Sequence, residues 1–318
     1  MQHFITFQNL TKNGYQIAET IQSLWSGYGQ IVRLKNANGE TLIAKHINPP
    51  SATNHPRGWN TNASHQRKLQ SYLVELHWYT NYAQFCDNSC RIPQLISSES
   101  IDQEHLIILE DLNSSGFPKR KSSLQISEIK VVLNWLANFH ATFLDHDGSG
   151  LWPIGTYWHL ATRREEWEAM EAGQLKKAAT KIDHALNNCQ FKTLVHGDAK
   201  LANFCFANDG NKVAAVDFQY IGKGCGMKDV VYFLGSCLTD NECEKLAPEL
   251  LDFYFQKLED SLTNCNFLID FTTLEKEWRQ MYPIAWADFH RFLLGWMPTH
   301  QKLTSYSKQQ VKLALAIL

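Results

Sequence analysis

The chain has 318 residues, of which 44% are hydrophobic and 12% aromatic, so it contains ample apolar material for a packed core and is long enough for two lobes or domains. This composition excludes intrinsically disordered, collagen-like and low-complexity proteins. The 30 basic and 32 acidic residues give a formal charge of −2, which excludes a basic nucleic-acid footprint over the whole chain, although not a local patch.

The first part of the chain is predicted to be a small antiparallel sheet with one inserted helix. Asn38-Gly39 lies between two strand-like runs within residues 16–47, and such a pair favours a tight hairpin turn. Residues 48–61 hold three prolines and three asparagines and predict a loop. Periodicity then predicts a helix at 64–85 and strands at 93–100 and 105–111.

After Gly116 and Pro118 the pattern becomes mainly helical, with one short β region around residues 194–218. Helices are predicted at 126–145, 160–188, 226–238, 241–264 and 271–295. We therefore expect an α+β protein with a strand-rich lobe at 1–112 and a large helical lobe at 113–318. A cleft between two lobes is a favoured place for a ligand.

Neither a targeting segment nor a membrane span is recognisable in the sequence. The apolar runs, such as residues 313–318, are far shorter than the roughly 18 residues that cross a bilayer. The eight cysteines could form disulfides in a secreted protein, but without a signal peptide reduced core thiols are the better interpretation. Cys86 and Cys90 are weak evidence for a zinc site. We expect a cytoplasmic protein with no membrane or nucleic-acid partner.

The segment TLVHGDAKLANFCF carries the clearest chemical signal. Its Asp198 and Asn203 are five residues apart, the H-x-D-x-x-x-x-N arrangement of a phosphoryl-transfer catalytic loop that begins at His196. An Asp carboxylate can align an acceptor hydroxyl and take its proton, and an Asn offers Mg²⁺ a neutral oxygen ligand. Asp217 ends the apolar strand of VAAVDFQ, where we expect the second magnesium ligand. Residues 208–211 predict the turn of a hairpin between Asn203 and Asp217.

A lysine and a glutamate of the first lobe are candidate nucleotide contacts. Lys45 lies in the strand TLIAKHI, where it can meet the α- and β-phosphates of ATP. Glu75, on the inserted helix, would hold this lysine, because a lone buried lysine tends to lose its charge. Taken alone, Lys45 could simply face solvent.

Two backbone segments of the first lobe are further candidates. Gly27 and Gly29 lie between the first two strands, where a glycine-containing loop can cover phosphates, although ordinary turn residues are an equal alternative. Glu110 to Leu112 end the last strand of the lobe, where backbone groups can bond the edge of an adenine.

VHGDAKLANF and VDFQ, with LEDL and LANFHATF before them, resemble the aminoglycoside phosphotransferase and choline kinase superfamily. GLWPIGTYW, GKGCGMKDVVYFL and ADFHRFLLGWMP are most similar to its ecdysteroid-kinase-like branch, and the resemblance covers residues 26–298. It implies a protein-kinase-like bilobal fold that transfers the γ-phosphate of ATP to a hydroxyl of a small molecule. It also implies roles for particular residues: Asp198 as base, Asn203 and Asp217 as Mg²⁺ ligands, Lys45 and Glu75 as the phosphate-holding pair, Lys200 near the γ-phosphate and Asp229 as a brace of the catalytic loop.

The chain departs from protein kinases at several places. Gly197 stands where those enzymes usually carry Arg, and no A-P-E sequence occurs, so a protein substrate is disfavoured. Val32 replaces the third glycine of the phosphate loop, and Gln219 replaces the Gly of D-F-G. His196 fits a structural histidine better than a participant. A pseudokinase-like module that binds a nucleotide or metabolite without transferring phosphate is the alternative function.

Seven of the ten tryptophans follow residue 130. Trp152, Trp158, Trp286 and Trp296 are candidates for an aromatic acceptor pocket, which could bury a sterol-like skeleton or bind a quaternary ammonium group. Core packing is the alternative and is favoured for most of these tryptophans.

Overall fold

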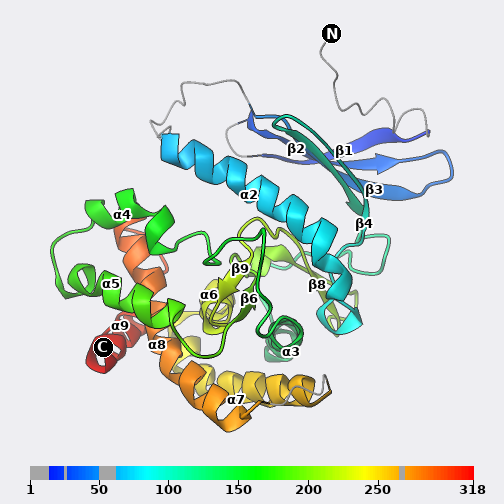
Figure 1. Ribbon diagram of the computed structural model, residues 1–318. Helices are drawn as coiled ribbons and strands as arrows, with labels where there is room; N and C mark the ends of the chain where they lie inside the picture. The colour runs from blue at the N-terminus through cyan, green and yellow to red at the C-terminus, as the bar shows by residue number, and fades with distance from the viewer. Residues whose placement is uncertain (1–13, 25–26, 50–61, 265–268) are drawn as a thin grey trace.

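The computed structural model describes residues 14–24, 27–49, 62–264 and 269–318. Ser26, Cys265, the amino-terminal segment and residues 50–61 of the predicted loop lie outside the described residues. The described chain forms a sheet-containing lobe and a larger helical lobe, as predicted, and one long helix lies between them (Figure 1).

The first lobe is built on an antiparallel sheet with the strand order β1-β2-β3-β5-β4. Its strands are β1 (Gln16–Ser23), β2 (Gly29–Lys35), β3 (Thr41–Ile47), β4 (Leu95–Ile101) and β5 (Glu104–Glu110). Lys35 pairs with Thr41 at the end of the β2–β3 hairpin, and Gly39 in the turn has a φ of 87°. The predicted Asn38-Gly39 hairpin is therefore confirmed, because the turn needs a positive φ that glycine adopts without strain.

Helix α2 (Asn62–Asn81) is the inserted helix and packs between the sheet and the second lobe (Figure 1). Tyr72 and Tyr79 are seven residues apart, lie on one face of the helix and are buried. Ser71 and Glu75 are also buried on the inner side of this helix. Polar side chains inside a core require partners, and these two find theirs at the interface between the lobes.

The second lobe contains the remaining described helices and four short strands. The helices are α3 (Ile126–Thr142), α4 (Arg164–Ala169), α5 (Gln174–Asn187), α6 (Met227–Cys237), α7 (Asp240–Asn264), α8 (Phe271–Trp296) and α9 (Ser305–Ile317). The strands form two pairs, β6 (Thr193–Val195) with β9 (Gly222–Gly224) and β7 (Phe204–Phe206) with β8 (Val213–Ala215). The predicted hairpin between Asn203 and Asp217 is therefore present.

The structure differs from the predicted helices in two places. The predicted helix at 160–188 is divided into α4 and α5, and Lys176 closes the break by donating hydrogen bonds to the carbonyls of Glu168 and Met170 at the end of α4. Helix α9 was not predicted, although Thr304 is a typical N-cap whose hydroxyl accepts a hydrogen bond from the Ser307 amide.

An aromatic cluster joins the lobes behind the cleft. Phe218 is fully buried, and its ring lies 4.8 Å from that of Trp78 on α2 and 4.6 Å from that of His196. The residues that follow Asp217 are thereby anchored to both lobes. Among the described residues, no helix combines the length and apolar character that a bilayer crossing requires, and the described cysteines have free thiols.

Candidate active site

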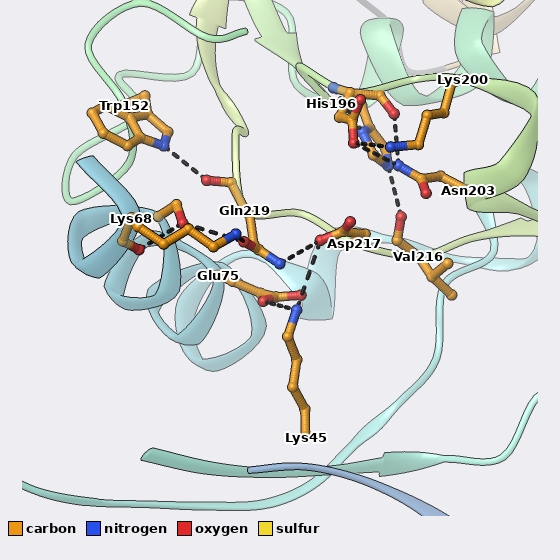
Figure 2. Close-up of polar contacts among 12 residues, drawn as sticks. Lys45, Lys68, Glu75, Trp152, His196, Lys200, Asn203, Val216, Asp217 and Gln219 are labelled. Atoms are coloured by element: carbon orange, nitrogen blue, oxygen red, sulfur yellow. Dashed lines mark hydrogen bonds and ion pairs between the residues drawn. The ribbon is translucent and has the colours of Figure 1, made fainter. Parts of the chain in front are cut away.

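A cavity of about 390 Å³ lies between the lobes, where residues far apart in the sequence come together. Lys45, Glu75 and Leu112 line it from the first lobe, and Asn203 and Asp217 line it from the second. Figure 2 shows the side chains of Lys45, Glu75 and Asp217 converging at one point of this cleft. Four of the predicted nucleotide residues and both predicted metal residues thus share one cavity, which Gly27 and Gly29 do not line.

Lys45 and Glu75 form a buried ion pair across the sheet–helix interface. The Lys45 Nζ atom lies 2.5 Å from Glu75 Oε2 and 3.7 Å from Asp217 Oδ1. Burial would lower the pKa of Lys45, but the two carboxylates outweigh it and the pKa is raised. The lysine therefore keeps its charge at the point where α2, β3 and the end of the β8 segment meet.

Asp229 of α6 holds the catalytic loop through hydrogen bonds to its backbone. Its carboxylate accepts hydrogen bonds from the backbone amides of His196 (2.6 Å) and Gly197 (2.9 Å) and lies 3.2 Å from the His140 ring. Gly197 has a φ of 79°, and a Cβ there would lie 2.0 Å from the Tyr220 carbonyl oxygen. The Arg that protein kinases carry at this place would therefore clash with the backbone.

The two ring nitrogens of His196 form their described hydrogen bonds with the protein backbone. Its Nε2 atom lies 3.0 Å from the Val216 carbonyl oxygen, and its Nδ1 atom accepts a hydrogen bond from the Asp198 amide. The ring thus ties the catalytic loop to the segment that carries Asp217. This geometry supports a positioning role for His196.

Replacing Asp229 by alanine should lower the free energy of unfolding by at least about 2 kcal/mol, because two buried backbone N–H groups lose their acceptor. Denaturant unfolding followed by circular dichroism measures the loss. Asp252→Ala, which removes an exposed carboxylate from α7, is the matched control. Equal stability of the two variants would contradict the bracing role.

Asp198 has one carboxylate oxygen bound and one free. Its Oδ2 atom accepts hydrogen bonds from Lys200 Nζ (2.9 Å) and Asn203 Nδ2 (3.1 Å). Its Oδ1 atom is buried and has no partner among the described residues. Burial and the Asp217 carboxylate raise the pKa of Asp198, and Lys200 opposes them. A buried, unpaired acceptor oxygen of this kind is suited to receive a hydroxyl proton.

Asn203 and Asp217 fit a magnesium site that is completed by phosphate oxygens. The described residues leave Oδ1 of Asn203 and Oδ2 of Asp217 without a hydrogen-bond partner. Burial would raise the pKa of Asp217, but Lys45, Lys68 and Lys200 outweigh it, so the pKa is lowered. One carboxylate and one amide oxygen match Mg²⁺, which in phosphotransferases takes few protein ligands and fills its shell with phosphate and water.

The structure explains the presence of glycine at positions 29 and 27 in two different ways. Gly29 has a φ of 136°, and a Cβ there would lie 2.0 Å from the His46 carbonyl oxygen, so the close approach of β2 to β3 requires glycine. Gly27 has a φ of 77° and open space around it, as a turn residue has. Strand packing explains Gly29 and turn geometry explains Gly27, and the contact of both glycines with phosphate stays a prediction.

The end of β5 offers a backbone donor to the cleft. The Glu110 side chain is engaged elsewhere, because it accepts hydrogen bonds from Arg91 (2.6 Å) and from the Gln94 amide (3.0 Å). The Leu112 N–H donates no hydrogen bond within the described part of the chain, and Leu112 lines the cavity. Leu112 therefore presents a free donor where an adenine edge is expected.

The four candidate acceptor tryptophans do not share one pocket. Trp158 and Trp286 are buried in the helical core, where the Trp158 indole donates a hydrogen bond to Asp288 and the Trp286 ring packs against Tyr306. Both are candidates for an acceptor pocket, but packing against α6, α8 and α9 places them in the core, the alternative favoured for most of the tryptophans. Trp296 is 39% exposed and stacks on Phe292.

Trp152 contacts a residue of the site, and its indole N–H is already used in that contact. It donates a hydrogen bond of 2.8 Å to the backbone carbonyl of Gln219 (Figure 2). Its ring stacks on Tyr220. Its observed contacts thus hold the loop after Asp217.

Sequence reasoning missed two residues of the site, Lys68 and Gln219. Lys68 precedes Glu75 by seven residues, two helical turns, so helical spacing places both on the same face of α2. Gln219 lines the cavity, and its side chain lies between Lys68 and Asp217. The replacement of the D-F-G glycine by Gln219 is the sequence feature that could have identified this residue.

Comparisons with known proteins agree with this architecture. An amicoumacin kinase solved with AMP-PNP and Ca²⁺ is 11% identical, with 98% of this chain and 92% of that chain covered and a TM-score of 0.52. A microcompartment-associated aminopropanol kinase is 14% identical, with coverages of 98% and 94% and a TM-score of 0.52. At these identities the likeness shows the kinase-like fold, and a search of curated proteins found no match.

A family model covers more than half of the chain, with matched residues in both lobes. The ecdysteroid kinase-like family matches residues 60–144 and 157–267, which include α2, the catalytic loop and Asp217. The predicted resemblance is therefore confirmed, and the chain belongs to the ecdysteroid kinase-like family.

Proposed function

We propose that this protein is an ATP- and Mg²⁺-dependent phosphotransferase that moves the γ-phosphate of ATP to a hydroxyl group of a small molecule. The observation that carries the proposal is the unpaired, buried Oδ1 atom of Asp198 beside Lys200 and Asn203. Family membership and the kinase-like fold support it. Residues 1–112 would bind the nucleotide, and residues 113–318 would supply the catalytic loop and the acceptor site.

The first lobe would contact the adenine and the phosphates, and the second lobe would hold the metal ion. Leu112 would offer its amide to the adenine, Gly27 and Gly29 would cover the phosphates, and Lys45 is charged and held by Glu75. Asn203 and Asp217 would hold Mg²⁺, which on binding neutralises the charge that develops on the phosphate oxygens. The cationic Lys45 and the two proposed metal ligands line the same cavity, so they can act on the same phosphate groups.

Asp198 would orient the acceptor hydroxyl and remove its proton. As the hydroxyl oxygen forms its bond to the γ-phosphorus, the bond from that phosphorus to the β–γ bridging oxygen breaks and ADP leaves. The proton passes to Oδ1 of Asp198, while Lys200 and Asn203 hold Oδ2. Positioning and charge stabilisation account for most of the acceleration in such a reaction.

The charges around Asp198 disfavour an acceptor with many positive charges. Lys200 contacts the base directly, and no carboxylate lies within ion-pair distance of Lys302 among the described residues. Lys302 is the second cation, and its charge interacts with that of Asp198. Its Nζ atom lies 4.7 Å from the centre of the Tyr232 ring, and burial lowers its pKa to about 8. We therefore propose a neutral or weakly charged hydroxylated acceptor, since two lysines would repel a polycation.

The acidic clusters of the second lobe do not change this conclusion. Glu166 pairs with Arg163, and Glu168 pairs with Arg164. Asp240 accepts hydrogen bonds from the first amides of α9, and Glu242 caps its own helix at Thr239. These four carboxylates therefore already have structural partners.

A time course of ADP formation with panels of sterols, amino alcohols, sugars and aminoglycosides tests the proposal. We expect acceptor-dependent ADP formation that requires Mg²⁺, with a phosphorylated product detected by mass spectrometry. Aminoglycosides should be the poorest panel. Nucleotide binding without ADP formation in any panel would favour the pseudokinase-like alternative, and transfer to a generic protein substrate would contradict the small-molecule acceptor.

A further inference from the structure

Gln219 connects helix α2 to the proposed metal ligand Asp217. Its Nε2 atom donates a hydrogen bond of 2.8 Å to Asp217 Oδ1, and its Oε1 atom accepts one of 2.8 Å from Lys68 Nζ. A third bond of 3.2 Å comes from the Ser71 hydroxyl. Figure 2 shows this side chain between Lys68 and Asp217. Gln219 is 5% exposed, so these bonds form away from bulk solvent.

The rest of the residue is also fixed. The Trp152 indole donates to the Gln219 carbonyl oxygen, and the preceding Phe218 packs on Trp78. Three elements therefore hold one glutamine: α2 through Lys68 and Ser71, the segment around Trp152, and the aromatic cluster. A glycine at this place would have no side chain and would leave Lys68 and Asp217 unconnected.

Asp217 needs such support. Its φ is 71°, a left-handed conformation that is strained for a residue other than glycine and persists only when its surroundings fix it. Gln219 occupies Oδ1 of the carboxylate, and the described residues leave Oδ2 free. The glutamine thus determines which oxygen faces the cleft.

We propose that Gln219 is a positioning residue that assembles the metal site before nucleotide arrives, by locking Asp217 to α2 through Lys68. This inference rests on the proposed function for its consequence, metal binding, but the lock itself is a property of the free protein. Groups that hold a metal ligand in place typically contribute 10–100-fold to metal affinity.

The test uses Gln219→Leu, Lys68→Met and the double variant. Titration with Mg²⁺ at saturating AMP-PNP should show an apparent Kd that is about tenfold higher for each single variant. The double variant should also be about tenfold weaker, because both changes break one connection, whereas independent effects would multiply to about 100-fold. Multiplied effects, or an unchanged Kd in Gln219→Leu, would overturn the proposal.

The sign of the Lys68→Met effect separates the lock from simple electrostatics. Removing a positive charge near Asp217 should by itself strengthen Mg²⁺ binding. The proposal predicts the opposite, weaker binding, because Gln219 loses the donor that fixes it. Stronger Mg²⁺ binding in Lys68→Met would therefore overturn it.

Hydrogen exchange of the free protein tests the lock without any ligand. Amides of α2 should exchange several-fold faster in Gln219→Leu and in Lys68→Met than in the wild type. Gln70→Leu, the same change at an exposed position of α2, is the matched control and should not alter exchange. Unchanged exchange in both variants would contradict the lock. Faster exchange in a protein that binds no Mg·AMP-PNP would instead retain the lock and reject the proposed phosphotransferase function.

Discussion

Replacing Asp198 by asparagine should lower kcat by about 100- to 10,000-fold, the usual contribution of a general base. The change keeps the shape of the side chain and an oxygen that can accept from Lys200, but it removes the basic oxygen that takes the proton. Affinity for Mg·ATP should change little, because Asp198 is absent from the residues that line the nucleotide cavity. Single-turnover phosphate transfer and calorimetric nucleotide binding measure the two effects separately.

The matched control for this prediction is Asp209→Asn, the same substitution in the exposed turn between β7 and β8. It should retain wild-type turnover. Turnover within a factor of three in Asp198→Asn would contradict the assignment of the base. Joint loss of turnover and nucleotide binding would instead indicate a folding defect, which the melting temperature of the free variant detects.

The pH profile offers a further check on the same residue. Burial raises the pKa of Asp198, and only the ionised form can accept the hydroxyl proton. The value of kcat/KM should therefore fall as the pH is lowered through this raised pKa, at a higher pH than an ordinary aspartate would cause. Asp198→Asn should lose this acidic limb.

Replacing Asp217 by alanine should abolish the Mg²⁺-dependent part of nucleotide binding. A ligand present at about 100 times its Kd stabilises a protein by about 2.7 kcal/mol, which raises the melting temperature by several degrees. The wild type should show this shift with Mg·ATP and lose it with EDTA. The alanine variant should show none, because the only carboxylate among the two proposed metal ligands is gone.

Backbone strain at Asp217 requires a second variant. With a φ of 71°, alanine is less well tolerated there than asparagine, which visits the left-handed region more readily. Asp217→Asn should therefore fold at least as well as Asp217→Ala and still bind Mg·ATP more weakly than the wild type. Asp260→Ala, at an exposed position of α7, controls for loss of a carboxylate. An undiminished Mg·ATP shift in both Asp217 variants would remove this residue from the metal site.

Local features of this protein could be predicted because contiguous residues determine them. The Asn38-Gly39 turn follows from two residues that tolerate positive φ, and α2 follows from apolar residues at helical spacing. The catalytic loop could also be predicted from one short segment, because the chemistry needs Asp198 and Asn203 at a fixed separation. Family membership followed from motifs of the same kind.

Features that depend on how distant elements pack were not predictable from periodicity. The sequence alone could not separate a tryptophan in the core from one in a pocket, since Trp158 and Trp286 became buried only when α6, α8 and α9 packed together. Helix α9 is not predicted because its last residues, 313–318, form an uninterrupted apolar run that has no helical period. The break at residues 170–173 depends on a lysine in the following helix.

The fold class, the family and the residue types of the site could be predicted, because they depend on local pattern and spacing. The free oxygen of Asp198 and the link from Lys68 through Gln219 to Asp217 depend on how the folded elements meet. Lys68 and Gln219 are 151 residues apart, and a hydrogen bond requires its two atoms to approach within about 3 Å. That proximity is set by the docking of one lobe on the other, which no single segment encodes.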